Sequence, residues 1–347
     1  MDLATFILGL LLSVFAAVIP TAIWASLVWW CDRYEREPIP LLVVSFVWGA
    51  LPAVLLALLL ETLLDVPGGG LGQGLVREVV SASAVAPIVE ELAKGGALLL
   101  ILLFWRGELD DVLDGILYGA MIGFGFAMTE NLLYFMSALS DGGWGEWGTV
   151  VFLRGVVFGL NHAFFTAFSG AGLGYARLAR GRGGRYGAPL LGLGAAILAH
   201  AVHNLGTPLS GVQTAAILLS LVGDAGGVLL VAVMIGLALR QEQRWLRTEL
   251  TDEIGRLLTA PEYEMLSSLR GRWRMLRQAR RAGGWQAVRA VSQLQQAATE
   301  LVFSKQRTRT RGPDPQLARR QDGFESRLAA VRRVFENPAG LRKETQC

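Results

Sequence analysis

Repeated apolar stretches are the feature of this sequence that most restricts its fold. Seven of them are long enough to cross a bilayer as helices, which takes about 20 residues each. Their approximate bounds are 4–30, 40–61, 79–104, 112–136, 149–175, 188–206 and 212–239. Backbone groups inside a membrane must pair within the protein, and a helix achieves this within one segment. The sequence therefore predicts an all-α fold, a polytopic transmembrane helix bundle of seven or eight spans.

Charged residues divide the chain into two regions. Residues 240–347 contain 22 of the 32 Lys and Arg residues and 12 of the 29 acidic residues. We predict a transmembrane domain over 1–239 and a basic, helical cytoplasmic tail over 240–347, with a helical hairpin broken at Gly283-Gly284. The arginine-rich face from Arg270 to Arg281 fits either anionic membrane lipid or simple solvation. Because no recognised nucleic-acid-binding motif accompanies it, nucleic acid is not an expected partner.

The distribution of Arg among the loops predicts the orientation in the membrane. Loops 31–39, 105–111 and 176–187 and the start of the tail all carry Arg, whereas the opposite side has Arg77 alone. Basic loops stay in the cytoplasm, so we expect a multi-pass plasma-membrane protein with its N-terminus outside and its tail cytoplasmic. The first apolar run lacks a basic flank and continues past Pro20, which indicates an uncleaved span. The distant Cys31 and Cys347 predict no disulfide.

Three ionisable residues interrupt the third apolar stretch. Glu90, Glu91 and Lys94 lie inside the stretch Ser81 to Trp105, and Lys94 is the only lysine before residue 300. Each charge within a membrane helix costs roughly 2.5–3.5 kcal/mol on insertion scales, so such groups usually line a cavity and serve a function. All three histidines also fall within predicted spans. This concentration of titratable groups indicates a membrane enzyme or transporter.

The helical positions of the three residues predict different environments for the two carboxyls. Glu90 and Lys94 are four residues apart and share a helix face, so they can form an ion pair. Glu91 projects about 100° away. We therefore expect Lys94 to restrain Glu90 and Glu91 to face a cavity, which places slightly more weight on Glu91 as the catalytic base. Pro87, one turn earlier, is expected to bend the helix and widen that cavity.

Three further spans carry polar groups. The fourth contains Glu130 and Asn131, the fifth contains Asn161 and His162, and the sixth contains His200, His203 and Asn204. The helical rise places Glu90 and His162 roughly 16 and 20 Å from the outer ends of their spans, and Glu130 and His200 roughly 9 Å. These groups thus share one band in the outer half of the membrane. Asp224 is interpreted as a hydrogen-bonding partner, and Arg154 as a residue that extends outward.

Small residues recur four positions apart in these spans. The pairs Gly119/Gly123, Gly155/Gly159 and Gly170/Gly174 would let neighbouring helices approach closely. Packing between transmembrane helices is sufficient to explain them.

Four short motifs, in order on successive spans, resemble those of the PrsW-type intramembrane proteases. They are E-E-x-x-K at Glu90, F-x-x-x-E-N at Phe126, H-A-x-F-T-A-x-x-G at His162 and H-x-x-x-N at His200. The chain is similar, more distantly, to the CAAX-processing and bacteriocin-immunity membrane proteases. The resemblance covers roughly residues 40–239 and leaves the basic tail outside.

The resemblance implies that the chain hydrolyses a peptide bond of a membrane-anchored protein. Founding members of the family cleave a membrane-anchored anti-sigma factor on its extracytoplasmic side. We expect Glu90, Glu91, His162 and His200 to be catalytic. The supporting residues expected around them are Lys94, Glu130, Asn131, Asn204 and His203.

Two hydrolytic mechanisms remain open, and other classes compete with them. The favoured mechanism has no cofactor: Glu90 or Glu91 acts as general base on water, and a histidine orients the water or stabilises the oxyanion. In the alternative, zinc bound by Glu90, Glu91, His162 and His200 activates the water, although H-E-x-x-H is absent. A proton-coupled transporter is the rival function, but no internal repeat supports it. A signalling scaffold acting through the tail is a third.

Overall fold

The protein is described by a computed structural model that covers residues 2–64, 74–210 and 215–336. The described residues form helices and no β-strand, which confirms the predicted all-α class. The chain separates into two compact units. One contains residues 1–32 and 37–235, and the other contains residues 33–36 and 236–347.

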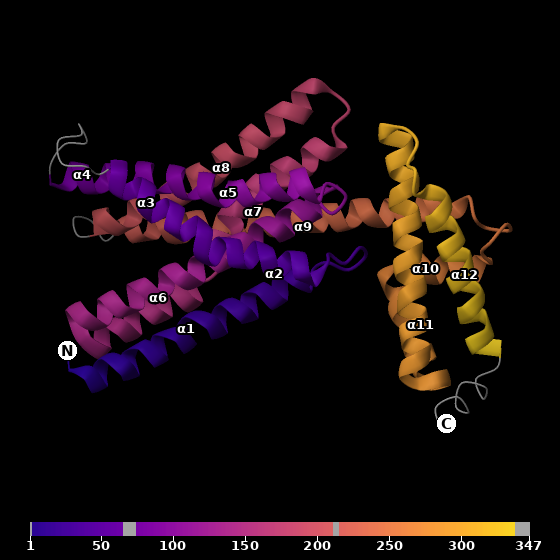
Figure 1. The fold of residues 1–347 in the computed structure, drawn as a ribbon, viewed down its shortest axis with the longest axis horizontal. Helices are drawn as coiled ribbons and strands as arrows, with labels where there is room; N and C mark the ends of the chain where they lie inside the picture. Colours follow the sequence, from indigo (N-terminus) through magenta and orange to yellow (C-terminus); the bar gives the residue numbers. More distant parts are fainter. Residues whose placement is uncertain (1, 65–73, 211–214, 337–347) are drawn as a thin grey trace. The chain divides into compact units, whose positions relative to one another are not determined.

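Among its described residues, nine helices begin in the first unit, and π-helical turns or a kink interrupt several of them (Figure 1). The turns are Gly49–Ala53 between α2 and α3, Ser81–Val85 between α4 and α5, and Leu153–Val157 before α7, while Gly143 breaks the helical geometry of α6. The helices are α1 (Leu3–Trp29), α2 (Ile39–Trp48), α3 (Val54–Leu64), α4 (Leu75–Val80), α5 (Ala86–Phe104), α6 (Val112–Phe152), α7 (Asn161–Leu178), α8 (Arg182–Ser210) and α9 (Ala215–Thr251).

Five helical stretches within the described residues are long and apolar enough to cross a membrane. They are Leu3–Trp29, Ile39–Leu64, Val112–Leu178, Arg182–Gly206 and Leu218–Thr251. The stretch Val112–Leu178 contains both α6 and α7. The helix α5 is not among the five, and it carries the three charges of Glu90, Glu91 and Lys94. The transmembrane helix bundle is therefore confirmed, whereas the count of seven spans stays a prediction.

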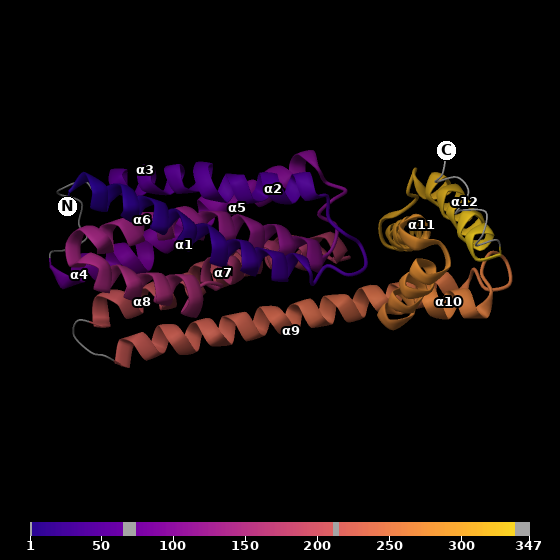
Figure 2. The same cartoon turned by 90° about the horizontal axis from the view of Figure 1, so that it is seen from below.

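The helix α6 packs against α1, α2 and α7, and its first half, from Leu113 to Ala127, is buried (Figures 1 and 2). Its contact with α7 is made through glycine. A Cβ atom added to Gly123 would lie 2.2 Å from the carbonyl oxygen of His162, and one added to Gly115 would lie 2.0 Å from that of Gly170. Most of the predicted glycine contacts are thus present, and they hold the backbone of His162 directly against α6.

We expect Gly123→Ala to lower both stability and activity, although it adds only one methyl group. The added methyl group meets backbone atoms, so α7 must move and take His162 with it; overpacking of this kind costs about 1–3 kcal/mol. The melting temperature in detergent and the rate of substrate cleavage should both fall. Gly226→Ala is the matched control because a Cβ atom there meets nothing within 4 Å. Equal effects of the two substitutions would contradict the assignment.

The π-helical turn before α5 has a chemical origin in Pro87. In this turn the N–H of Ala86 bonds to the carbonyl of Ser81, five residues earlier. The same pattern would pair the carbonyl of Ala82 with residue 87, but proline has no N–H to donate. Instead Asn204 donates from Nδ2 to the oxygen of Ala82 at 2.9 Å. This hydrogen bond ties the turn that leads into α5 to α8, just before Glu90.

The second unit has a core of its own. Besides the end of α9 it contains α10 (Ala260–Leu266), α11 (Leu269–Arg311) and α12 (Leu317–Glu336). Gly283 and Gly284 leave helical geometry inside α11, and the φ of Gly284 is +60°. Gln295 donates to the backbone of Arg272, and Arg272 donates to the hydroxyl of Thr299, so the two halves of α11 lie against each other. The predicted helical hairpin is therefore confirmed.

Candidate active site

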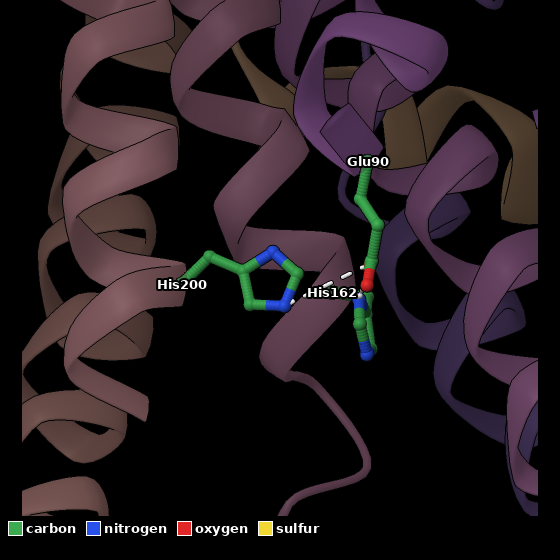
Figure 3. Close-up of side chains that lie close together, drawn as sticks. All are labelled: Glu90, His162 and His200. Atoms are coloured by element: carbon green, nitrogen blue, oxygen red, sulfur yellow. Dashed lines mark ion pairs between the residues drawn. The ribbon is translucent and has the colours of Figure 1, made fainter. Parts of the chain in front are cut away.

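The polar residues predicted on four spans meet in the interior of the first unit. The helix α5 contributes Glu90, Glu91 and Lys94, α6 contributes Glu130, α7 contributes His162, and α8 contributes His200. Figure 3 shows Glu90 and the two imidazole rings pointing toward one another from three separate helices. Glu91 and Lys94 have no exposed surface, and Glu90, His162 and His200 are all at least 95% buried.

Lys94 forms the polar centre of this group. Its Nζ lies 3.1 Å from Glu90 Oε2, 2.8 Å from Glu91 Oε1 and 3.1 Å from His162 Nδ1. The same ammonium lies 3.9 Å from the centre of the Phe126 ring. The sequence predicted that Lys94 pairs with Glu90, which is correct, but the long side chain reaches both carboxylates. A buried charge is stable only with such partners, so Lys94 holds the two carboxylates together.

Glu91 has no free oxygen and does not face a cavity. Its Oε1 contacts both Lys94 and the Nδ1 of His200, the latter at 3.1 Å, and its Oε2 accepts from the hydroxyl of Thr166 at 3.0 Å. The expectation that Glu91 is the unrestrained carboxyl is therefore wrong. Residue Thr166 lies one turn after His162 on α7, and its position in the histidine motif was the available signal for this contact.

Each imidazole uses one nitrogen on a carboxylate and turns the other toward Glu90. His162 Nε2 lies 2.8 Å from Glu130 Oε2, and His200 Nδ1 lies 3.1 Å from Glu91 Oε1. A carboxylate accepts hydrogen bonds, so the nitrogen facing it carries the hydrogen and the remaining nitrogen keeps its lone pair. Those remaining atoms, His162 Nδ1 and His200 Nε2, lie 3.9 and 3.8 Å from Glu90 Oε2.

Arg154 belongs to the site and does not extend outward as predicted. Its guanidinium pairs with Glu130 and donates from Nε to Asn131 Oδ1 at 2.7 Å. It also stacks over the ring of Tyr134 at 3.9 Å. Glu130 therefore lies between Arg154 and His162, while Asn131 contacts the arginine and not the histidines. The chain turns back on itself within α6, where Gly143 leaves helical geometry, and this brings residues 23 and 24 positions apart into contact.

A cavity of about 550 Å³ leads to Glu90. Among the four residues predicted to be catalytic, Glu90 alone lines it; Glu91, His162 and His200 lie deeper. The walls combine apolar side chains with ionisable ones, and Asn204 and Glu130 also contribute to them. The lining residues include Val54, Leu58, Leu133, Glu61, Arg77, Glu78 and Tyr134.

The region of the chain that contains this site matches a known protein family. Residues 37–239 match the family model described as PrsW family intramembrane metalloprotease. That match covers more than half of the chain and all four motifs. The chain belongs to the PrsW family. The resemblance inferred from the motifs is therefore confirmed, and the matched region ends where the basic tail begins.

Individual PrsW relatives match part of the same region. Protease PrsW of Clostridioides difficile (strain 630) is 34% identical over 122 residues, which is 35% of this chain and 49% of the relative. Protease PrsW of Bacillus subtilis (strain 168) is 31% identical over 103 residues, 30% of this chain and 44% of the relative. The chain thus spans about half the length of the curated relatives it matches. No solved structure matches.

The description of the PrsW family as metalloproteases can be tested on the donor atoms of this site. Among the described residues, Glu90, His162 and His200 form a group whose ligand atoms all lie within 4.8 Å of one another. Two imidazoles and one carboxylate are a donor set of catalytic zinc sites, in which ligand atoms lie about 3.4 Å apart. The observed 3.8 and 3.9 Å are slightly longer. Glu91 was also expected as a ligand, but its oxygens face away.

Two features of the surroundings bear on this fit. The carboxylates of Glu91 and Glu130 hold the outer nitrogens of the two rings, an arrangement that metal-binding histidines almost always have. Lys94 opposes it, since its Nζ lies 3.1 Å from both Glu90 Oε2 and His162 Nδ1. A metal ion between Glu90 and the two rings requires Lys94 to give up its contacts with Glu90 and His162 and to keep only the shorter one, with Glu91. With that adjustment, the residues fit a divalent metal ion.

His203 extends the PrsW site toward α9, a role that the motifs left unassigned. Its Nδ1 lies 2.7 Å from Asp224 Oδ2, and its Nε2 lies 3.1 Å from Asn161 Nδ2. Asn161 in turn accepts from the backbone N–H of His162 at 2.8 Å. The interpretation of Asp224 as a hydrogen-bonding partner is confirmed. Both nitrogens of His203 are occupied, so it supports the backbone of His162 and does not face Glu90.

Proposed function

We propose that this chain hydrolyses a peptide bond of a membrane-anchored protein at the inner end of the Glu90 cavity. The observation that carries the proposal is the convergence of Glu90 Oε2 with His162 Nδ1 and His200 Nε2, the ring nitrogens that Glu130 and Glu91 do not occupy. Such a set can activate a water molecule in a space that bulk water does not fill. The membership in a protease family supports the same reaction.

Glu90, His162 and His200 are proposed to hold a divalent metal ion, for which zinc fits the donor set. A metal bound there polarises a peptide carbonyl and lowers the pKa of water. Glu91 and Glu130 keep the lone pairs of the rings directed toward Glu90, and Thr166 fixes Glu91. This proposal replaces our preference from sequence for a metal-free mechanism, because both rings are oriented as ligands and the family is described as metalloproteases.

The shape and polarity of the cavity support a protein substrate that is anchored in the membrane. Leu58, Leu133 and Val54 offer apolar contacts, whereas Glu61, Glu78 and Arg77 offer polar ones near the same cavity. A segment that leaves the bilayer carries both kinds of side chain. With the N-terminus outside, as loop charges predict, cleavage falls on the extracytoplasmic side of the plasma membrane. An anti-sigma factor is the substrate class proposed by resemblance to founding family members.

Cleavage of a membrane-anchored reporter in nanodiscs containing the purified chain tests the proposed function. The wild-type chain should release a fragment that begins or ends within or next to the membrane segment. Mass spectrometry of the fragments identifies the bond. Failure to cut any membrane-anchored reporter, while the chain remains folded and inserted, would contradict the proposal.

We expect Glu91→Gln to weaken the site without removing it. Glutamine keeps the size of the side chain but is a weaker acceptor for His200, and losses of 10–100-fold in metal affinity or activity are typical of such outer partners. Metal titration and the cleavage rate measure the change. The exposed Glu146 supplies a matched control, Glu146→Gln, which should leave both unchanged. Loss of all activity in Glu91→Gln, with Glu90→Gln still active, would reverse the assigned roles.

A further inference from the structure

The first half of α11 presents a concentrated basic surface that the family match does not cover. Between Glu264 and Glu300 the chain contains no acidic residue. Five arginines before the break at Gly283-Gly284 are exposed and follow the spacing of one helix face, with offsets of 4, 7, 10 and 11 residues from the first. We call them the arginine face: Arg270, Arg274, Arg277, Arg280 and Arg281.

The arginine face is interleaved with exposed tryptophan. Trp273 is 55% exposed and Trp285, just after the break in α11, is 66% exposed. Arg277 lies over the ring of Trp273 at 3.3 Å, and Arg280 lies over that of Trp285 at 4.7 Å. Large aromatic rings are costly to leave in water. Their exposure beside cations is typical of a surface that contacts the boundary between lipid headgroups and acyl chains.

Several other arginines of the second unit have acidic partners, unlike those of the arginine face. Arg256 pairs with Glu253, Arg309 with Glu249, and Arg332 with Glu262. Arg272 is turned inward and donates to Leu266 and Thr299, so it is not part of the face. Within the described residues, no carboxylate lies in ion-pair contact with any of the five arginines of the face.

We propose that the arginine face and Trp273 bind the anionic headgroups of a phospholipid bilayer. The guanidinium groups complement phosphate, and the tryptophan ring suits the headgroup boundary. The chain also favours this partner over a soluble one. The apolar stretch Leu218–Thr251 is long enough to cross a membrane, and only a short stretch of chain separates it from α11. That connection keeps the local concentration of lipid headgroups high.

Depth-dependent fluorescence quenching in nanodiscs tests the proposal on the full chain. Gln278→Cys places a dye beside the arginine face, and Ser326→Cys places one on α12, each after Cys31→Ser and Cys347→Ser. Lipids with a nitroxide in the headgroup quench a dye that touches the membrane surface. We expect strong quenching at position 278 in discs rich in phosphatidylglycerol, little in discs of phosphatidylcholine, and little at position 326 in either. High salt should reverse the effect.

Charge variants separate a lipid site from general basicity. The triple variant Arg274→Gln, Arg277→Gln, Arg281→Gln should weaken binding to anionic lipid about 100-fold, so quenching falls to the phosphatidylcholine level. The matched variant Arg319→Gln, Arg327→Gln, Arg333→Gln removes the same charge from exposed arginines elsewhere and should retain quenching. Circular dichroism and resistance to protease confirm that each variant is folded.

Two results would overturn the proposal. Equal quenching at position 278 in neutral and anionic discs would mean that the face does not recognise headgroup charge. Tight binding of a labelled oligonucleotide or an acidic peptide by the chain in neutral discs, without any response to phosphatidylglycerol, would assign the face to that partner instead.

Discussion

Glu90→Gln is expected to reduce cleavage of a membrane-anchored reporter by at least about 100-fold, the usual contribution of an acid–base group. Glu90 is the carboxylate that both reaches the cavity and faces the lone pairs of His162 and His200. Glutamine has nearly the same shape but carries no charge. Rates measured with purified protein in nanodiscs, together with the fragment pattern in cells, provide the test.

The size-matched control for Glu90→Gln is Glu146→Gln on the exposed part of α6, which should cleave at the wild-type rate. Expression and insertion of the two variants should also be equal. A Glu90→Gln protein that cleaves normally would remove Glu90 from the chemistry. Attention would then pass to Glu130, the other carboxylate of this group that lines the cavity.

Removal of bound metal is expected to abolish cleavage, and addition of zinc to restore it. The purified wild-type chain should contain about one zinc ion, as a three-ligand catalytic site does. His162→Asn and His200→Asn should each lose the ion, because each removes one donor nitrogen. Elemental analysis measures the metal content independently of activity.

His203→Asn provides a matched control for these two substitutions. One of its nitrogens contacts Asn161 and the other contacts Asp224. Its replacement should therefore leave the metal content unchanged and reduce activity less than His162→Asn or His200→Asn does. A metal-free chain that cleaves at the full rate would instead support the mechanism in which Glu90 alone acts as general base.

Much of the fold could be predicted from the sequence because hydrophobic length and helical spacing are local properties. The apolar stretches, the break at Gly283-Gly284 and most of the glycine contacts all follow from residues near one another in the chain. The ordered motifs likewise predicted which residues meet in the site. Their depth in the membrane stays a prediction, as does the orientation of the chain.

The errors arose where a long side chain chooses among partners on other helices. Lys94 reaches two carboxylates and an imidazole, although its spacing indicated one partner. Arg154 follows α6, and the chain reverses at Gly143 within that helix, so its contact with Glu130 depends on how the chain folds there. Arg272 sits among exposed arginines in sequence but packs inward. Helical spacing gives the direction of a side chain from its axis and does not identify what lies in that direction.

The ion pairs around Glu90 also set the net charge of this buried site. Three carboxylates, those of Glu90, Glu91 and Glu130, are matched by two cations, Lys94 and Arg154. With all five ionised, the buried cluster has one surplus negative charge, and a divalent cation changes this to one surplus positive charge. The charged site could then accept a single further negative charge and become neutral, which is the condition that a low-dielectric environment favours most.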